Sequence, residues 1–198
     1  MELANRDKNE VVVADDNFRD YLSKKYENIQ FISSTTKCLK SQELVKNEIN
    51  NEKYKLVCLD YNLNHNFNFL NSLSQEEKDK TEFLINAICP PGCLYRKNHY
   101  YLNSYSHLNY GKHYNMEYCG ITGIYPSPGN ETTLHHMKYN EIKEKYEPLG
   151  FSHFKIEGRT WNDLDLLLTY CSYLIKPEYR NYVLSKAYNI ICQNYGVF

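Results

Sequence analysis

The feature of this sequence that most constrains its fold is an alternation of short β-branched runs with helix-like segments. The runs are VVVAD, IQFISS, KLVCLD and TEFLINA, at residues 11–15, 29–34, 55–60 and 81–87. Between them, FRDYLSKKY, SQELVKNEINN and NFLNSLSQEEKDK have the apolar spacing of amphipathic helices, with Ser41 as an expected N-cap. This alternation predicts βα units around a parallel sheet. The spacing of about 20 to 26 residues per unit is that of a (β/α) barrel.

The alternation breaks after Ala87 for about 45 residues. This segment holds Cys89, Cys93 and Cys119, many tyrosines and the turn signals PPG, CG and SPG. A long irregular segment in a compact domain is usually functional or disordered, and this one is too aromatic to be disordered. We interpret it as a functional loop. ITGIY, at residues 121–125, is either a sixth strand or, as we favour, a short extended piece at the end of the loop.

Regular structure is predicted again beyond the loop. LHHMKYNEIKEKYEPLG reads as a helix that ends at Gly150, and residues 152–157 follow as a strand. The next helix is predicted from an apolar stripe formed by Leu164, Leu167, Leu168, Cys171, Leu174 and Ile175. Pro177 ends it, and EYRNYVLSKAYNIICQNY is predicted as the last helix.

These elements give one expected domain over residues 1–198. A length of 198 residues with 42% hydrophobic content suffices for a single core without disulfide bonds. The expected fold class is α/β, a TIM-barrel-like (β/α) domain with a long cysteine-bearing loop. Because five or six strands are predicted and a closed barrel needs about eight, we expect the barrel to be open or incomplete.

Composition limits the expected partners and compartment. A formal net charge of −1 gives no overall basic field for holding nucleic acid, so any RNA contact must be local. The charged N-terminus has no apolar signal region, and no apolar run approaches the roughly 20 residues that span a bilayer. We therefore expect a soluble cytoplasmic protein without membrane contact. Seven cysteines, an odd number, favour free thiols or metal ligands over a disulfide framework.

Several cysteines follow predicted strands, where the functional groups of a (β/α) barrel stand. Cys38 follows the second strand, Cys89 and Cys93 follow the fourth, and Cys119 lies in the same long loop. A Cys-x3-Cys pair with a third thiol 26 residues later resembles an iron–sulfur ligand set more than a zinc ribbon. The alternative is free cysteines in an aromatic loop. The remaining thiols, Cys58, Cys171 and Cys192, are interpreted as packing residues.

Two charged clusters are further candidates. The RKNH sequence, Arg96 to His99, is suited to a carboxylate or phosphate, and a solvated surface is the alternative. The KIEGR sequence places three charged residues at a strand end: Lys155, Glu157 and Arg159. They form either a substrate clamp or, as we favour, an internal ion network. Glu157 is expected to pair with Lys155, Arg159 or another buried cation, with Ile156 packed outward against helices. The adjacent histidines at 135 and 136 are expected to be exposed, because they face two ways.

The stretches SSTTK, DYNLN, LINAICPPGCLYRKNH and GFSHFKIEGRT, in this order, resemble the collagenase-like peptidase family, peptidase family U thirty-two. The resemblance spans about residues 11–180, and KIEGR is its most specific element. It implies a TIM-barrel-like catalytic domain. It also implies a 4Fe-4S cluster on four cysteines and oxygen-independent hydroxylation of RNA bases or quinone precursors, while other members are described as proteases.

Carried over by position, the resemblance implies Cys89, Cys93 and Cys119 as cluster ligands. The resemblance leaves two candidates for the fourth ligand: Cys38, which lies on the right face and is the one expected here, and Cys171, which matches only the general region of a later cysteine. The site expected at the barrel mouth also has catalytic residues Glu157, Arg159 and His99, and substrate-binding residues Asn62, Asn64, Asn86, Arg96 and Lys155.

The function expected from these observations is a redox or modifying enzyme with an iron–sulfur cluster beside a pocket for a small aromatic molecule or RNA. The alternatives are a non-catalytic binding module with the same fold, or a relative of the peptidase type. A protease is disfavoured, because the sequence has no Gly-x-Ser-x-Gly and no Cys–His order that can be positioned. The opening strands of the family are missing, so the chain is a fragment, a reduced relative, or half of an assembly completed by a partner chain or second copy.

Overall fold

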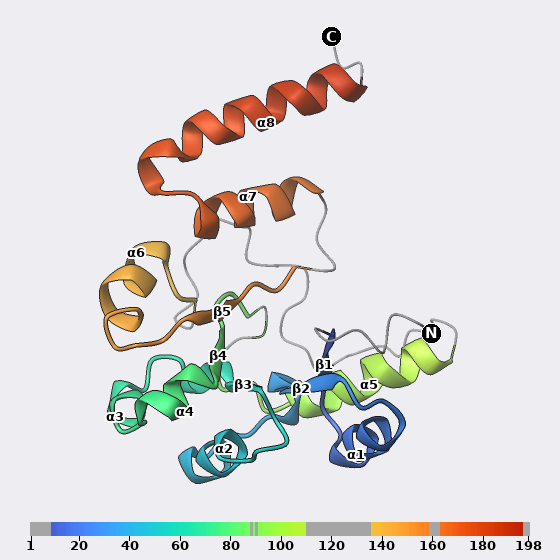
Figure 1. Ribbon diagram of the computed structural model, residues 1–198. Helices are drawn as coiled ribbons and strands as arrows, with labels where there is room; N and C mark the ends of the chain where they lie inside the picture. The colour runs from blue at the N-terminus through green and yellow to red at the C-terminus, as the bar shows by residue number, and fades with distance from the viewer. Residues whose placement is uncertain (1–8, 88, 90, 110–135, 159–162, 196–198) are drawn as a thin grey trace.

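A five-stranded parallel sheet forms the centre of the fold in the computed structural model, which describes residues 9–87, 89, 91–109, 136–158 and 163–195 (Figure 1). Its strands follow one another in sequence order, and each pairs in parallel with the next. They are β1 Asn9–Val13, β2 Ile29–Ser33, β3 Leu56–Cys58, β4 Thr81–Leu84 and β5 His153–Lys155. This confirms the predicted α/β class and the parallel sheet.

Helices connect the first four strands, as the alternation predicts. Helix α1 is Asp16–Lys25 and α2 is Gln42–Ile49, which Ser41 caps by accepting a hydrogen bond from Leu44 N. The segment predicted as one helix after β3 is two, α3 Phe67–Asn71 and α4 Gln75–Asp79. The break has a local cause: Ser74 and Glu77 form a capping box, which begins a new helix at this point.

The main core lies between one face of the sheet and these helices. The strands and the residues directly after them contribute Val13, Phe31, Val57, Leu59, Phe83 and Ile85, and α2 and α3 contribute Val45, Ile49, Phe69 and Leu70. Side chains alternate between faces along a strand, so Cys58 and Leu84 pack in a second cluster with Tyr61. Ile156 packs against the main core, as expected.

The prediction of an irregular loop after β4 is wrong for residues 96–108, because they form helix α5. Its N-cap, Tyr95, makes no capping side-chain hydrogen bond, so the sequence carries no start signal there. The ITGIY segment, at residues 121–125, lies outside the described residues. Further on, α6 Tyr139–Glu141 continues into a π-helical turn, Ile142–Tyr146.

The chain ends in two antiparallel helices, α7 Asp163–Leu174 and α8 Arg180–Tyr195, joined through a turn at Pro177–Tyr179. In Figure 1 α8 is the outermost element, and α7 lies between it and the sheet. Cys171 is buried, which confirms its interpretation as a packing residue, and Cys58 and Cys192 are buried too. No helix in the described part of the chain has the length and apolar character needed to cross a bilayer.

Candidate functional site

A buried ion pair between Arg96 and Asp60 lies at the carboxyl ends of the strands. Asp60 follows β3 and caps a 3₁₀ turn, Tyr61–Leu63, by accepting a hydrogen bond from Asn62 N at 3.0 Å. Arg96, the first residue of α5, donates through Nη1 to Asp60 Oδ1 at 3.3 Å and through Nη2 to Oδ2. Each side chain is 1% exposed. Charges so deeply buried persist only when they are paired, so this contact fixes α5 on the sheet edge.

The CPPGC stretch explains how Arg96 reaches a residue of the previous βα unit. Gly92 has a φ of +70°, a conformation that glycine adopts without a Cβ penalty. Its N–H donates to Asn62 Oδ1 at 2.8 Å, which ties the turn to the loop after β3. The turn therefore leads the chain from β4 back over the end of β3, where α5 begins. The CPPGC stretch therefore has a structural role, which is to position Arg96, and this role needs no metal.

Arg96 also contacts a thiol and two aromatic rings. Its Nε donates to Cys38 Sγ at 3.3 Å, and Cys38 Sγ lies 3.4 Å from the Thr36 carbonyl oxygen. The Arg96 guanidinium carbon is 4.3 Å from the centroid of the Tyr61 ring and 5.8 Å from that of Tyr100. A guanidinium over an aromatic face is an attractive arrangement, stronger where water is excluded. A thiol, a carboxylate and two phenols thus surround one fixed cation.

The protonation states in this group follow from burial and from Arg96. Burial raises the pKa of Tyr61 to about 12, against an opposing hydrogen bond from Arg96, and it raises the pKa of Tyr100 as well. Burial acts to lower the pKa of Arg96, but the negative charge of Asp60 and the contacts with the other neighbours outweigh it and keep this pKa above its ordinary value. At neutral pH the site therefore holds a permanent cation beside two neutral phenols, which are hydrogen-bond donors.

Cys89 and Glu157 lie near the same group. Cys89 packs against the cluster of Cys58, Tyr61, Leu84 and Ala87, on the sheet face opposite the main core. Glu157 adds to the effect of burial in raising the pKa of Tyr100, and negative charge on Cys89 would act in the same direction. Burial also raises the pKa of the Cys58 thiol, to about 12, which suits a packing residue.

Two of the expected substrate-binding amides are used inside the fold. Asn64 is fully buried and donates to the Leu84 carbonyl oxygen at 2.9 Å. Asn86 brackets the Glu157 backbone, accepting from its N–H at 2.7 Å and donating to its carbonyl oxygen at 2.8 Å. These bonds link neighbouring strand ends. Asn64 Oδ1 is buried and has no hydrogen-bond partner among the described residues. Asn62 is exposed, but its amide is also used: its Nδ2 donates to Asp60 Oδ1 at 2.7 Å, and its Oδ1 accepts from Gly92 N–H.

Lys155 of the KIEGR cluster, one of the cations expected as a partner for Glu157, pairs with a carboxylate on the neighbouring strand. The Lys155 amine lies 3.2 Å from Glu82 Oε2, on the neighbouring strand β4, which supplies the ion pair across two strands. The residues face each other because Leu84 pairs with Lys155 in the β4–β5 register and Glu82 lies two positions earlier on the same face. Arg159 lies outside the described residues. His99 is half-buried on α5, and burial lowers its pKa.

The described cysteines do not by themselves make a metal centre. Cys38 and Cys89 lie at this site, Cys93 belongs to the CPPGC turn, and Cys119 lies outside the described residues. Within the described ranges, no three His, Cys, Asp or Glu side chains gather as a metal-binding group. A ligand set of Cys38, Cys89 and Cys93 alone therefore does not fit.

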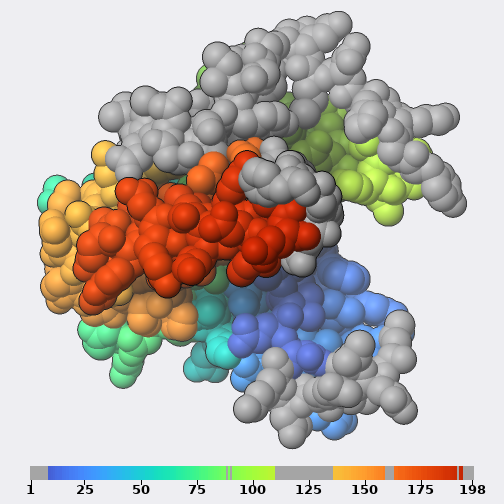
Figure 2. Space-filling model, turned by 90° about the horizontal axis from the view of Figure 1, so that it is seen from above, coloured from blue at the N-terminus to red at the C-terminus, as the bar shows by residue number. Residues whose placement is uncertain are grey.

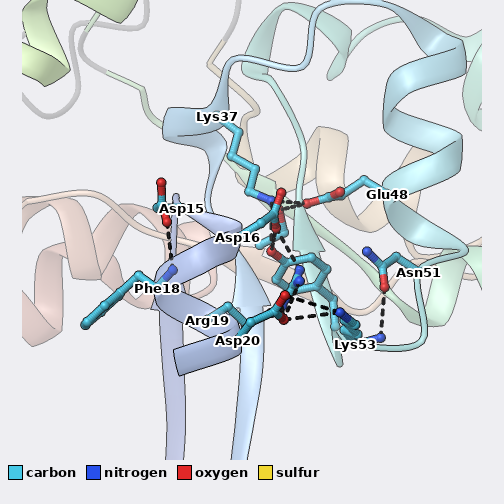
Figure 3. Close-up of polar contacts among 11 residues, drawn as sticks. Asp15, Asp16, Phe18, Arg19, Asp20, Lys37, Glu48, Asn51 and Lys53 are labelled. Carbon is cyan, nitrogen blue, oxygen red and sulfur yellow. Dashed lines mark hydrogen bonds and ion pairs between the residues drawn. The ribbon is translucent and has the colours of Figure 1, made fainter. Parts of the chain in front are cut away.

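A second charged network lies beside β1 and β2 (Figure 3). The sequence patterns did not predict it. Lys37 Nζ lies 2.7 Å from Asp16 Oδ1 and 2.6 Å from Glu48 Oε1, and it donates to Tyr54 OH at 2.8 Å. Asp16 also accepts from Arg19 Nη1 at 2.7 Å. The Lys37 side chain is 8% exposed and its three donors are used inside the fold, so this network ties α1, α2 and the turn after β2 together.

Asp60, Tyr61 and Tyr100 were not selected from the sequence. An acid at the end of a buried strand is a usable signal for Asp60, whereas the two tyrosines have no local signal among the 20 in the chain.

Neither a protein-family model, nor a curated protein, nor a solved structure matches this chain.

Proposed function

We propose that this chain is a modifying enzyme for a small aromatic molecule, built as an incomplete (β/α) barrel of the kind that the collagenase-like peptidase family resemblance implies. The observation that carries the proposal is buried Arg96, which holds Asp60 and Cys38 beside Tyr61 at the carboxyl ends of the strands. Catalytic groups of (β/α) barrels stand at this edge. The sequential strand order supports the barrel type, because each crossover then returns over the same face.

Each residue of the group has a role in this proposal. Arg96 fixes the position of the Cys38 sulfur through its Nε–H. Tyr61 and Tyr100 stay protonated at neutral pH, because burial raises the pKa of both. Tyr61 is 1% exposed and packs against Arg96, whereas the partly exposed ring of Tyr100 suits an aromatic ligand. Arg96, Asp60 and Tyr61 are almost completely buried, which limits the access of water to this group.

The iron–sulfur cluster is kept apart from this proposal. Cys38 and Cys89 lie at the site, and the described residues alone do not complete a ligand set. Iron and sulfide analysis after anaerobic purification tests the question directly. About four iron atoms per chain and absorption near 400 nm, lost in Cys89→Ala and Cys93→Ala but kept in Cys171→Ala, would establish a cluster. Iron-free protein would remove the cluster and leave the Arg96 site untouched.

Alkylation tests the proposed site itself. Iodoacetamide labelling of the native chain, mapped by mass spectrometry, gives the rate at which Cys38 reacts. We expect 4-hydroxybenzoate, a small aromatic probe, to slow labelling of Cys38 several-fold. Cys93, at the CPPGC turn, serves as the reference thiol, because protection confined to Cys38 places the probe beside Arg96. A Cys38 rate that the probe leaves unchanged would reject this substrate class.

The second candidate is a non-catalytic binding module with the same fold. It is favoured by one observation: Asp60 occupies both Nη atoms of Arg96, and the Asn86 amide is used by the Glu157 backbone. In that case Arg96 only anchors α5. Arg96→Lys would then lower stability without changing probe protection of Cys38, whereas the enzyme proposal predicts that both change.

A further inference from the structure

The two C-terminal helices leave a large apolar surface uncovered. On α7, Tyr170 is 47% and Leu174 67% exposed, and on α8 Tyr182 is 65% and Ile190 58% exposed. Figure 2 shows α8 as a ridge along one face of the molecule. Single exposed apolar residues are ordinary, but several large ones on two helices that pack together mark an interaction surface.

The spacing of these residues is that of a helix-packing seam. Tyr179, Tyr182, Lys186 and Ile190 stand at i, i+3, i+7 and i+11, which places them on one stripe of the helical segment. Lys186 Nζ lies 5.7 Å from the centroid of the Tyr182 ring, so the lysine stem covers the same stripe. On α7, Tyr170 and Leu174 are one turn apart.

The distribution of charge along α7 and α8 indicates which partner binds to this surface. Helix α7 begins with Asp163 and Asp165, whereas Lys176 and Arg180 lie at the connected end. Glu178 is the one acidic side chain in the connection, and the sequence of α8 contains no carboxylate. Because α7 and α8 are antiparallel, the pair is acidic at its open end and basic at its closed end. A two-fold axis across it brings opposite ends together, so the surface is complementary to itself.

We infer that α7 and α8 form a two-fold symmetric dimer interface with a second copy of this chain, giving an antiparallel four-helix arrangement. The inference is independent of the proposed function. Helix α8 has 16 residues and is therefore about 24 Å long. Two adjacent helices present a face about 20 Å wide. A face of this size has an area of roughly 480 Å², below the ~800 Å² that each partner buries in a stable complex, so a weak dimer is expected.

Sedimentation equilibrium of the full chain tests the inference over a range from about 1 to 200 μM. The expected result for the wild type is a monomer–dimer equilibrium. In the double variant Leu174→Asp with Tyr182→Asp, the dissociation constant of the dimer should rise at least tenfold. Leu44→Asp is the matched control, because Leu44 is 54% exposed on the distant helix α2 and should leave the dimer intact. Circular dichroism and thermal melting of each variant show that the fold is kept.

Charge exchange tests the orientation. Asp163→Lys and Lys176→Asp should each weaken the dimer several-fold, and combining them should restore it, because the two charges meet across the axis. A chain that stays monomeric at the highest concentration would overturn the inference, as would a dimer unaffected by the Leu174 and Tyr182 changes. A monomer that sediments with phosphatidylcholine–phosphatidylglycerol vesicles would instead assign the surface to lipid.

Discussion

The guanidinium of Arg96 and the carboxylate of Asp60 are 36 residues apart in the sequence and meet in a contact from which water is almost absent. The pair links the start of α5 to the end of β3. Burying two charges costs several kcal/mol each, and their attraction and hydrogen bonds offset this cost only while both partners are present.

Removing one partner should therefore be far more damaging than the pair is stabilising. We expect Asp60→Ala to lower the free energy of unfolding by about 3 to 5 kcal/mol, because Arg96 is left as an uncompensated buried cation. Urea denaturation measures the change. The matched control is Glu147→Ala, which breaks the exposed pair with Lys143 and should cost less than about 1 kcal/mol. Equal costs for the two variants would show that Arg96 finds water or another partner.

The Lys37 network makes a prediction about pH. Hydrogen bonds from Lys37 and Tyr54 lower the pKa of Asp16 below its ordinary 3.8 in the folded chain. A carboxyl whose pKa is lower in the folded than in the unfolded state stabilises the fold above the unfolded value, and this contribution is lost as pH falls through the folded value. Asp16 should therefore contribute fully at pH 6 and progressively less below about pH 4.

Lys37→Met separates this effect from general acid denaturation. The variant should be less stable at pH 6, by about 1 to 3 kcal/mol, because Glu48 loses its cation in a half-buried position. Its stability should also fall less steeply than that of the wild type between pH 5 and 3, as measured by urea titrations at each pH. Parallel pH profiles would show that Lys37 does not set the Asp16 pKa.

Much of this architecture follows from local patterns, but the contacts between distant segments do not. The β-branched runs predict the parallel sheet because their period is local, and Ser41 is recognisable as a cap from its neighbours. Helix α5 lacks a capping signal, and Arg96 reads equally well as a solvated cation until its position against Asp60 is known. Lys155 was one of the cations expected as a partner for Glu157, and strand register also places Glu82 beside it. Register and the path of a turn are tertiary properties, and no residue spacing in one segment encodes them.

Gly150 provides a test of backbone conformation after the π-helical turn. Its φ is +96°, and a Cβ there would clash with Gln75 Oε1, while the Gln75 amide donates to the Gly150 carbonyl oxygen at 3.0 Å. Gly150→Ala should destabilise the chain by about 1 to 3 kcal/mol through strain and the displaced amide. Gly92→Ala meets nothing within 4 Å, so it should cost only the backbone part, about 1 kcal/mol. Thermal melting compares them, and an equal loss in both would mean that the Gln75 side chain moves aside freely.

Phe83 is the aromatic centre of the main core and joins the sheet to the segment around α6. Its ring packs edge-on against Tyr146 at 5.3 Å and Phe151 at 5.0 Å, and it stacks with Phe154 at 5.7 Å. Because Phe83 is completely buried, Phe83→Ala removes both the apolar burial and these ring contacts, and the cavity cannot collapse without moving β4. We expect a loss of about 3 to 5 kcal/mol in urea denaturation. Phe18→Ala is the control, since this ring is 53% exposed on α1 and its removal should change stability by less than about 1 kcal/mol. A Phe83→Ala loss as small as that of Phe18→Ala would mean that β4 and the α6 segment do not pack as one unit around this ring.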